Sequence, residues 1–258
     1  MSAEPYSLER EAYSFLTENK FEEAFRLFTK SAEIYQELGN HEQATLCFAS
    51  AASCWNKKCE EKTFDNAALS YEKAAQEAER FVDYEYASLL YKYAAINHER
   101  NAESHGFSNC FYRSKECYRK FLIYSLFSPG KIRRIAKIKE EKGVIGFIKH
   151  VFMWFILSCS FAVWGHGERP ARSFLAAIAI ILLSAFCYTF DYVLVNGIIL
   201  KPDFFKAIYL SVVTFTTVGY GDISPMGLGK IVASIEAFSG AFVMPIFVVG
   251  LSRKYLRI

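Results

Sequence analysis

The chain has 258 residues, of which 52% are hydrophobic and 22% charged, and its formal net charge is +3. Such a small charge gives no electrostatic reason to expect a nucleic-acid partner. The sequence contains no paired-carboxylate site, nucleophile triad or phosphate-cradling loop, so we expect no enzymatic activity and no organic cofactor. The averages conceal a polar N-terminal half and a strongly apolar C-terminal half, which indicates two domains of different kinds.

The polar half carries a repeated pattern of small and aromatic residues. Five segments align at offsets 0, 4, 8 and 11, and their starts are 20, 23, 20 and 23 residues apart. These offsets share one face of a helix, where small residues let a neighbouring helix approach closely. The aligned residues are Ala24, Phe28, Ala32 and Tyr35; Ala44, Phe48, Ala52 and Trp55; Ala67, Tyr71, Ala75 and Ala78; Ala87, Tyr91, Ala95 and His98; and Cys110, Ser114, Tyr118 and Phe121. We predict antiparallel helix pairs here, with a further helix at about 8–17 and breaks at 18–20, 38–40 and 104–106.

This pattern resembles tetratricopeptide-like helical repeats over roughly residues 6–125. The resemblance implies an α-solenoid that can bind a peptide or another protein on its concave face, so its aromatic residues either anchor a partner or fill the core. The seven cysteines of the chain form no CxxC pair, and we interpret them as reduced packing residues. His98, His105 and Cys110 are conceivable metal ligands, but no second group of ligands accompanies them in the sequence.

A basic and then apolar linker is predicted between the halves. Lys131–Lys142 contains six basic and two acidic residues, which suits a helix on an anionic inner leaflet as well as a solvated linker helix. Val144–Trp164 is apolar enough to cross a membrane, but Lys149 and His150 lie within it and both flanks are basic. Because a crossing would leave those flanks on opposite sides, we predict that Gly146–Val163 lies along the inner membrane surface. The alternative, a crossing, would place the N-terminal half outside the cell.

The apolar half contains two stretches long enough to cross a hydrocarbon core. At 1.5 Å per residue, Ser173–Val195 and Ile231–Ser252 each exceed the roughly 30 Å required. Asn196-Gly197 marks a turn between them, and Pro202-Asp203 is a favourable start for a short helix that runs to Phe215. The sequence therefore predicts two transmembrane helices with a short helix between them.

The segment Thr216–Asp222 directly follows the short helix. Its sequence is Thr-Thr-Val-Gly-Tyr-Gly-Asp. Gly219 and Gly221 can take left-handed backbone angles at no steric cost, and this alternation can turn successive carbonyls to one side. These carbonyls, with the Thr217 hydroxyl, can then replace the water shell of a cation. The string resembles the selectivity filter of potassium channels, and the resemblance covers about Ser173–Ile258. Four such loops surround an ion in that family, which implies a homotetramer.

The resemblance also implies roles for individual residues in and near the filter. The expected ligands of K+ are Thr217, Val218, Gly219 and Tyr220, with Gly221 completing the ion-binding set. The expected supporting residues are Thr216, Asp222 and Tyr209, with the Tyr209 hydroxyl bracing Tyr220. Val213 stands where some bacterial members place a supporting Glu, so the partners of Asp222 must differ from theirs.

The second crossing carries the expected gating elements. Gly240 matches the glycine at which relatives bend, and Pro245 removes a backbone donor, which gives an independent reason for a kink. Glu236, one turn before Gly240, is an intramembrane carboxylate that faces either the back of the short helix or another subunit. Trp164–Pro170 is similar to a Gly-aromatic-Gly-Glu-Arg-Pro string of prokaryotic two-helix channels, with His166 here in the aromatic place.

These interpretations predict an all-α protein with a cytoplasmic repeat domain at 1–128, a linker with a membrane-interfacial helix at 129–172, and a pore domain at 173–258. Within the pore domain we expect crossings at 173–195 and 230–252, a pore helix at 204–216 and a filter at 217–222. The leading hypothesis is a potassium-selective channel of the cell membrane that conducts K+ passively, with both termini in the cytoplasm. Because only Arg253–Ile258 follow the second crossing, we expect regulation to come from the N-terminal domain. The alternatives are a less selective cation channel and a membrane-anchored scaffold or adaptor.

Overall fold

The computed structural model describes residues 3–58, 63–127 and 144–255 of the chain. Its regular structure is almost entirely α-helix, with three short strands, so the predicted all-α class is confirmed. The chain divides into two compact units between Ser158 and Cys159. The predicted basic segment Lys131–Lys142 lies outside the described residues.

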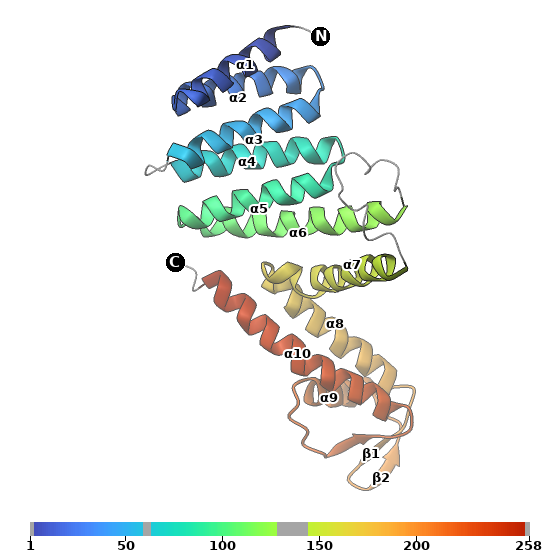
Figure 1. The fold of residues 1–258 in the computed structure, drawn as a ribbon. Coiled ribbons are helices and arrows are strands. Elements are labelled where there is room, and N and C mark those ends of the chain that lie inside the picture. The colour runs from blue at the N-terminus through green and yellow to red at the C-terminus, as the bar shows by residue number, and fades with distance from the viewer. Residues whose placement is uncertain (1–2, 59–62, 128–143, 256–258) are drawn as a thin grey trace. The chain divides into compact units, whose positions relative to one another are not determined.

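Six helices account for most of the described part of residues 3–127 (Figure 1). They are α1 (Ala3–Thr17), α2 (Phe21–Glu37), α3 (His41–Lys58), α4 (Thr63–Arg80), α5 (Tyr84–Arg100) and α6 (Ser104–Phe127). Each helix packs against the next one in the chain, which is the organisation of a solenoid. The first helix begins earlier than predicted. The break expected at 104–106 falls at 101–103 instead, and Gly106 lies inside α6.

Four of the connections between these helices repeat one backbone turn. Asn19, Gly39, Val82 and Ala102 have φ angles of 60°, 71°, 69° and 55°. In each case the next residue donates its amide to the carbonyl five residues back, as in the 2.8 Å bond from Asn40 to Tyr35. This bond closes the helix and reverses the chain within three residues. The turn is plain in the sequence at Gly39, whereas Val82 and Ala102 give no such signal.

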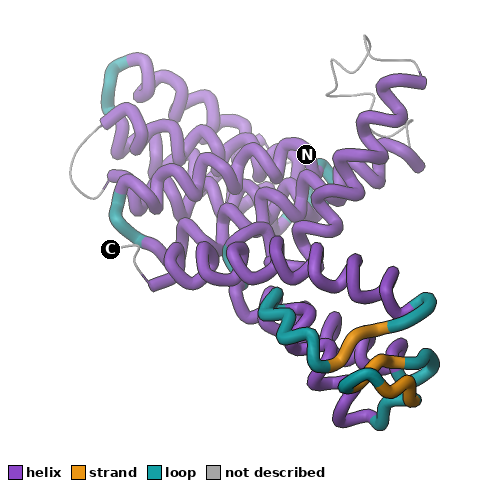
Figure 2. The backbone as a smooth tube through the Cα atoms, turned by 90° about the horizontal axis from the view of Figure 1, so that it is seen from below, coloured by secondary structure: helices purple, strands orange, loops and turns teal. Residues whose placement is uncertain are grey.

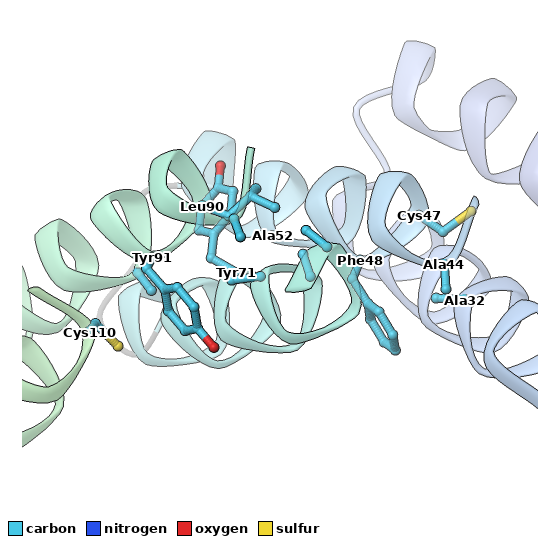
Figure 3. Close-up of a cluster of buried hydrophobic side chains, with 14 of the residues drawn as sticks. Ala32, Ala44, Cys47, Phe48, Ala52, Tyr71, Leu90, Tyr91 and Cys110 are labelled. Carbon is cyan, nitrogen blue, oxygen red and sulfur yellow. The ribbon is translucent and has the colours of Figure 1, made fainter. Parts of the chain in front are cut away.

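The predicted stripe of small and aromatic residues forms the core of this unit. All the aligned residues are buried except Trp55, which is half-buried, and Tyr118, which is exposed. Figure 3 shows Phe48, Tyr71 and Tyr91 among small side chains from neighbouring helices. Most of the aligned aromatic residues are therefore core residues rather than anchors for a partner.

Four cysteines of this unit, Cys47, Cys54, Cys110 and Cys117, are buried and not in disulfides. Burial raises the pKa of the Cys47 and Cys54 thiols to about 11. Because the thiolate is the reactive form, these two residues behave as inert packing groups. Cys59 lies outside the described residues.

The second unit combines long helices with a small sheet. α7 (Val144–Trp164) crosses the boundary between the units and ends at the short helical turn η2 (Gly165–Gly167). The helices α8 (Pro170–Tyr188), α9 (Phe204–Phe215) and α10 (Gly229–Tyr255) pack against one another. The strands β1 (Val193–Val195), β2 (Ile198–Leu200) and β3 (Ile223–Pro225) pair antiparallel in the order β2-β1-β3. Figure 2 shows the strands in orange.

The first crossing, predicted at 173–195, is corrected at both ends. α8 begins at Pro170, whose fixed φ suits the first turn of a helix, and it ends at Tyr188. Val193–Val195 is a strand because Asn196 and Gly197, with φ angles of 48° and 84°, form a two-residue hairpin turn. The sequence predicts this turn but not the strands that it joins.

Three helical segments of the described chain are long and apolar enough to cross a membrane: Gly146–Gly167, Pro170–Tyr188 and Gly229–Arg253. The first covers most of α7, which we expected to lie along the membrane surface. Large apolar side chains occupy several sides of α7, including Phe147, Phe152 and Phe155, which are all exposed. A surface helix normally has one polar face, so the composition of α7 is also compatible with a crossing.

Candidate functional site

The backbone of Thr217–Gly221 alternates in handedness. Thr217, Gly219 and Gly221 have φ angles of 59°, 58° and 77°, whereas Val218 and Tyr220 between them do not have positive φ. In a strand whose residues all have the same handedness, successive carbonyls point to opposite sides. Reversing the handedness of every second residue brings the carbonyls toward one side. Such a backbone can present a row of carbonyl oxygens to an ion.

Thr217 is an unexpected member of this alternation. A left-handed backbone is unfavourable for a β-branched residue, and the sequence predicts it for the glycines only. Hydrogen bonds to the end of α9 hold the strained segment: the Thr217 amide donates to the Thr214 carbonyl at 3.0 Å, and the Val218 amide donates to the Val213 carbonyl at 3.1 Å. Strain of this kind persists where the surroundings enforce it, and it is concentrated at functional sites.

Two large side chains of the Thr217–Gly221 loop are exposed in the single chain. Val218 is 52% exposed and Tyr220 is 71% exposed in the single chain. The loop therefore presents both side chains and its backbone at the surface of the single chain, where further copies of the chain can reach them.

The tyrosine at 209 contacts the last residue of the filter string. Its hydroxyl donates to Asp222 Oδ2 at 2.9 Å, whereas the sequence predicts a contact with Tyr220. Tyr209 lies on α9, so this bond ties the C-terminal end of the loop to the short helix. Thr216, the other predicted supporting residue, bonds within the helix end: its hydroxyl donates to the Val212 carbonyl at 2.7 Å.

Glu236 of α10 is hydrogen-bonded to both α8 and α9. Its carboxylate is 1% exposed and accepts a hydrogen bond from the Tyr188 hydroxyl of α8 at 2.7 Å. It also accepts a bond from the Ser211 hydroxyl of α9, and that hydroxyl lies 2.8 Å from the Ile181 carbonyl of α8. The sequence predicts that Glu236 faces either the back of the short helix or another subunit. In the structure it faces the short helix of its own chain.

Gly240 lies where α10 passes the end of α9. A Cβ atom added there would sit 1.9 Å from the Phe215 carbonyl oxygen, so only glycine allows the two backbones to approach so closely. α10 runs as one helix from Gly229 to Tyr255, through both Gly240 and Pro245. Gly240 therefore has a packing role next to Phe215, just before the Thr216–Asp222 loop, and α10 is continuous at the predicted hinge.

Asp191 is a structural residue that sequence reasoning missed. It follows α8 and accepts a hydrogen bond from the Gly229 amide at 2.7 Å, which caps the first turn of α10. Its carboxylate would also be only 3.0 Å from a Cβ added at Gly227. The sequence signal was present, since Asp191 is a charged residue within the first apolar stretch.

The turn between α7 and α8 packs against the C-terminal part of α10. A Cβ atom added at Gly250 would lie 3.3 Å from Pro170 Cβ, and one added at Gly167 would lie 3.3 Å from Arg253 Nη1. Gly165 and Gly167 both have positive φ, as does His166 between them. The turn whose sequence is similar to a string of prokaryotic channels thus makes direct contact with the last turns of α10.

Side chains within the same turn fix its shape. His166 is buried, and its Nδ1 lies 3.0 Å from the Ser160 hydroxyl at the end of α7. Arg172 of α8 lies over the Phe161 ring, 4.4 Å from its centroid, and donates to the Phe161 carbonyl at 2.9 Å. The end of α7 and the start of α8 are thus linked on both sides of the turn.

Comparison with known proteins supports a transport function for this unit. Residues 175–257 match the model of an ion channel family. "Potassium channel protein 1" of Methanocaldococcus jannaschii is 39% identical over 97 residues, which cover 33% of this chain and 26% of that relative. The chain therefore spans about a quarter of the relative's length. No solved structure matches the chain significantly.

The match and the apolar helices together support a membrane location for the chain, and residues 175–257 are similar to an ion channel family. They also point to transport rather than to catalysis. The matched segment contains the alternating loop, the bond between Tyr209 and Asp222, and the Glu236 network.

Proposed function

We propose that this chain is the subunit of a tetrameric potassium-selective channel that conducts K+ passively. The alternating backbone of Thr217–Gly221, within the string Thr-Thr-Val-Gly-Tyr-Gly-Asp, is the observation that carries the proposal. Carbonyl oxygens in such a row replace hydration water around a dehydrated cation. One loop reaches an ion from one side only, so four copies are needed. The exposed Val218 and Tyr220 side chains provide surface for contact between those copies.

The short helix α9 contributes to the same function. Its C-terminal end, at Phe215, carries partial negative charge, which favours a cation that waits before the filter. The Ser211 bonds and the close approach of Gly240 hold this helix against α8 and α10. Irregular backbone is tolerated at membrane depth where it is buried by protein or lines a water-filled path.

Ion flux into liposomes containing the purified full chain tests the proposal. We expect potassium but not sodium flux from the wild type. Tyr220→Asp keeps the backbone carbonyl but replaces the aromatic ring with a short charged side chain. This change should disturb the geometry of the carbonyl array and lower the potassium-to-sodium permeability ratio. Tyr192→Asp, the same substitution at an exposed tyrosine outside the filter, is the matched control and should leave the ratio unchanged. An unchanged ratio in Tyr220→Asp would contradict the filter assignment.

We further propose that both termini lie in the cytoplasm and that α7 rests on the inner membrane surface. The basic residues on both sides of α7 support this orientation, because basic segments favour the cytoplasm. The apolar character of α7 opposes it. Labelling of intact cells with a membrane-impermeant thiol reagent should reach a cysteine placed at Asn196 and miss one placed at Ser2. Labelling at Ser2 would make α7 a crossing.

Regulation by the N-terminal helices is the last part of the proposal. The turn at Gly165–Pro170 contacts the last turns of α10, so a movement of α7 can reach α10 through Pro170 and Arg253. A regulatory partner can shift the open and closed populations only by its differential affinity for the two states. Deleting residues 1–128 should change open probability and leave ion selectivity unchanged. Identical gating of the truncated and full chains would make the helical repeat a targeting or assembly domain instead.

A further inference from the structure

Three different metal-ligating side chains meet between successive helices of the repeat unit. Glu72 comes from α4, His98 from α5 and Cys110 from α6, and their donor atoms all lie within 4.8 Å of one another. His98 Nε2 is 2.6 Å from Glu72 Oε1, and Cys110 Sγ is 3.1 Å from the same oxygen. His98 and Cys110 are each only 2% exposed, whereas the Glu72 side chain is 28% exposed. The cluster is therefore buried on two sides and open to solvent along Glu72.

A second carboxylate occupies the other nitrogen of the same histidine. His98 Nδ1 lies 2.5 Å from Glu103 Oε2, and Asp65 also approaches the imidazole. Histidine ligands of metals almost always donate their second N–H to a carboxylate or carbonyl, which fixes the tautomer and leaves the first nitrogen free to bind. The Glu103 carboxylate is close enough to Nδ1 for that role, although Nδ1 makes no hydrogen bond among the residues that the structure describes, and Nε2 lies against Glu72.

Gly106 sets the position of the imidazole ring. A Cβ atom added at Gly106 would lie 2.6 Å from His98 Nδ1 and 2.7 Å from two ring carbons. This close contact explains why a glycine lies inside α6, two residues after its start. The ring is thus held by the packing of α6 on one side and by carboxylates at both nitrogens.

We propose that Glu72, His98 and Cys110 form a site for a borderline divalent transition-metal ion of the zinc class. A set of imidazole nitrogen, thiolate sulfur and carboxylate oxygen suits zinc, whereas Ca²⁺ and Mg²⁺ prefer oxygen ligands throughout. Water can complete the tetrahedron from the side where Glu72 is exposed. On binding, the thiol proton and any proton on Nε2 leave to solvent, since metal ligands must be deprotonated.

The ligand atoms need to move slightly farther apart to admit the ion. Bonds of about 2.0–2.3 Å in a tetrahedral site give ligand separations of about 3.3–3.6 Å. The observed separations are 2.6 Å and 3.1 Å, which also fit hydrogen bonds that protons maintain in the metal-free protein. Glu72 belongs to both contacts and is the most exposed ligand, so rotation of its side chain can provide the opening. A bound ion would join α4, α5 and α6, and this inference does not depend on channel activity.

Cobalt binding by the full-length protein in detergent tests the site. After treatment with a chelator, the protein is titrated with Co²⁺, whose thiolate complexes give a charge-transfer band in the near ultraviolet. We expect one ion per chain, with the band removed by added Zn²⁺. Cys110→Ser should abolish the band. Cys117→Ser, at another buried cysteine of the same helix, should retain it.

Two further variants separate ligation from packing. Glu103→Gln should weaken binding by about 10–100-fold and keep the band, because it alters the support of His98 and not a ligand. Glu72→Gln should abolish the rise in thermal unfolding temperature that Zn²⁺ produces in the wild type, and circular dichroism checks that each variant is folded. The proposal is overturned if the wild type shows no thiolate band, or if the band survives in a folded Cys110→Ser protein.

Discussion

The helical repeat unit (α1–α6) and the pore unit of the proposed channel (α8–α10 and the strands) differ in how their apolar residues are covered. In the repeat unit neighbouring helices of the same chain bury the aromatic stripe, and Phe28 and Tyr91 are 0% and 1% exposed. In the pore unit large apolar side chains remain outside, with Phe238 at 67% and Tyr220 at 71% exposed. The core of the first unit is thus closed by its own chain, whereas the second leaves apolar surface that lipid and further copies would cover in the proposed channel. Substitutions should therefore affect folding of one chain in the repeat unit, and assembly and conduction in the pore unit.

The largest effect is expected from Gly240→Ala. The added methyl group would meet the Phe215 carbonyl oxygen at 1.9 Å, and a backbone atom cannot rotate away as a side chain can. The end of α9 and the attached filter must then move. We expect loss of the tetramer or of potassium conduction, measured by size-exclusion chromatography and liposome flux. The control Gly250→Ala, whose nearest contact is 3.3 Å from Pro170 Cβ, should retain both.

The same variant decides between the packing and hinge roles of Gly240. A stable, selective tetramer with a reduced open probability would favour the hinge that the sequence predicts. Loss of selectivity or assembly would favour the packing role at the base of the filter. Pro245→Ala restores a backbone donor without adding volume near Phe215, so it should change gating alone if α10 bends.

Phe28→Ala should have the largest effect on the repeat unit. The ring is fully buried and packs edge-on against Tyr13 at a centroid distance of 5.0 Å. Removing a buried aromatic ring costs about 3–5 kcal/mol, because both transfer energy and packing are lost. Hydrogen exchange should rise across α2 and α3 and stay unchanged across α9. Leu69→Ala, at a side chain 48% exposed, is the control, and equal effects of the two variants would contradict the assigned core.

Glu236→Ala tests whether a buried polar network holds the pore unit together. The change removes the acceptor of the buried Tyr188 hydroxyl, which costs about 1–3 kcal/mol. The Ser211 hydroxyl loses one acceptor and keeps the Ile181 carbonyl as the other. We expect the tetramer to dissociate at a lower temperature in detergent. Glu236→Gln keeps an acceptor oxygen and should have a smaller effect. If both variants match the wild type, the network does not contribute to stability.

The same contrast between the units explains how far the sequence could be interpreted. Helical periodicity is a local property, so it predicts the buried stripe of α2–α6 and the crossing by α10. Contacts between distant residues leave no periodic signal. The capping of α10 by Asp191, the approach of Gly240 to Phe215 and the reason for a glycine at 106 all depend on such contacts.

Backbone handedness sets a second limit on sequence interpretation. Glycine marks the left-handed positions at 219 and 221, but Thr217 and Val82 adopt the same region without any marker. The short strands around Asn196-Gly197 were within reach, because this dipeptide between apolar residues is a strong hairpin signal. They were missed because Val193–Val195 also reads as the end of an apolar crossing.

The smallest effect is expected from Tyr209→Phe, which removes only the hydroxyl that donates to Asp222 at 2.9 Å. A single hydrogen bond contributes about 0.5–1.5 kcal/mol, and exposure in the single chain places this one at the lower end. The ring stays in place, so α9 and the carbonyl row keep their positions. We expect an unchanged potassium-to-sodium permeability ratio together with faster loss of current during sustained opening, measured in planar bilayers. Asp222→Asn keeps an acceptor for the phenol and should lie between Tyr209→Phe and the wild type. A changed permeability ratio in Tyr209→Phe would mean that the bond determines the shape of the ion-binding row and not only the stability of its outer end.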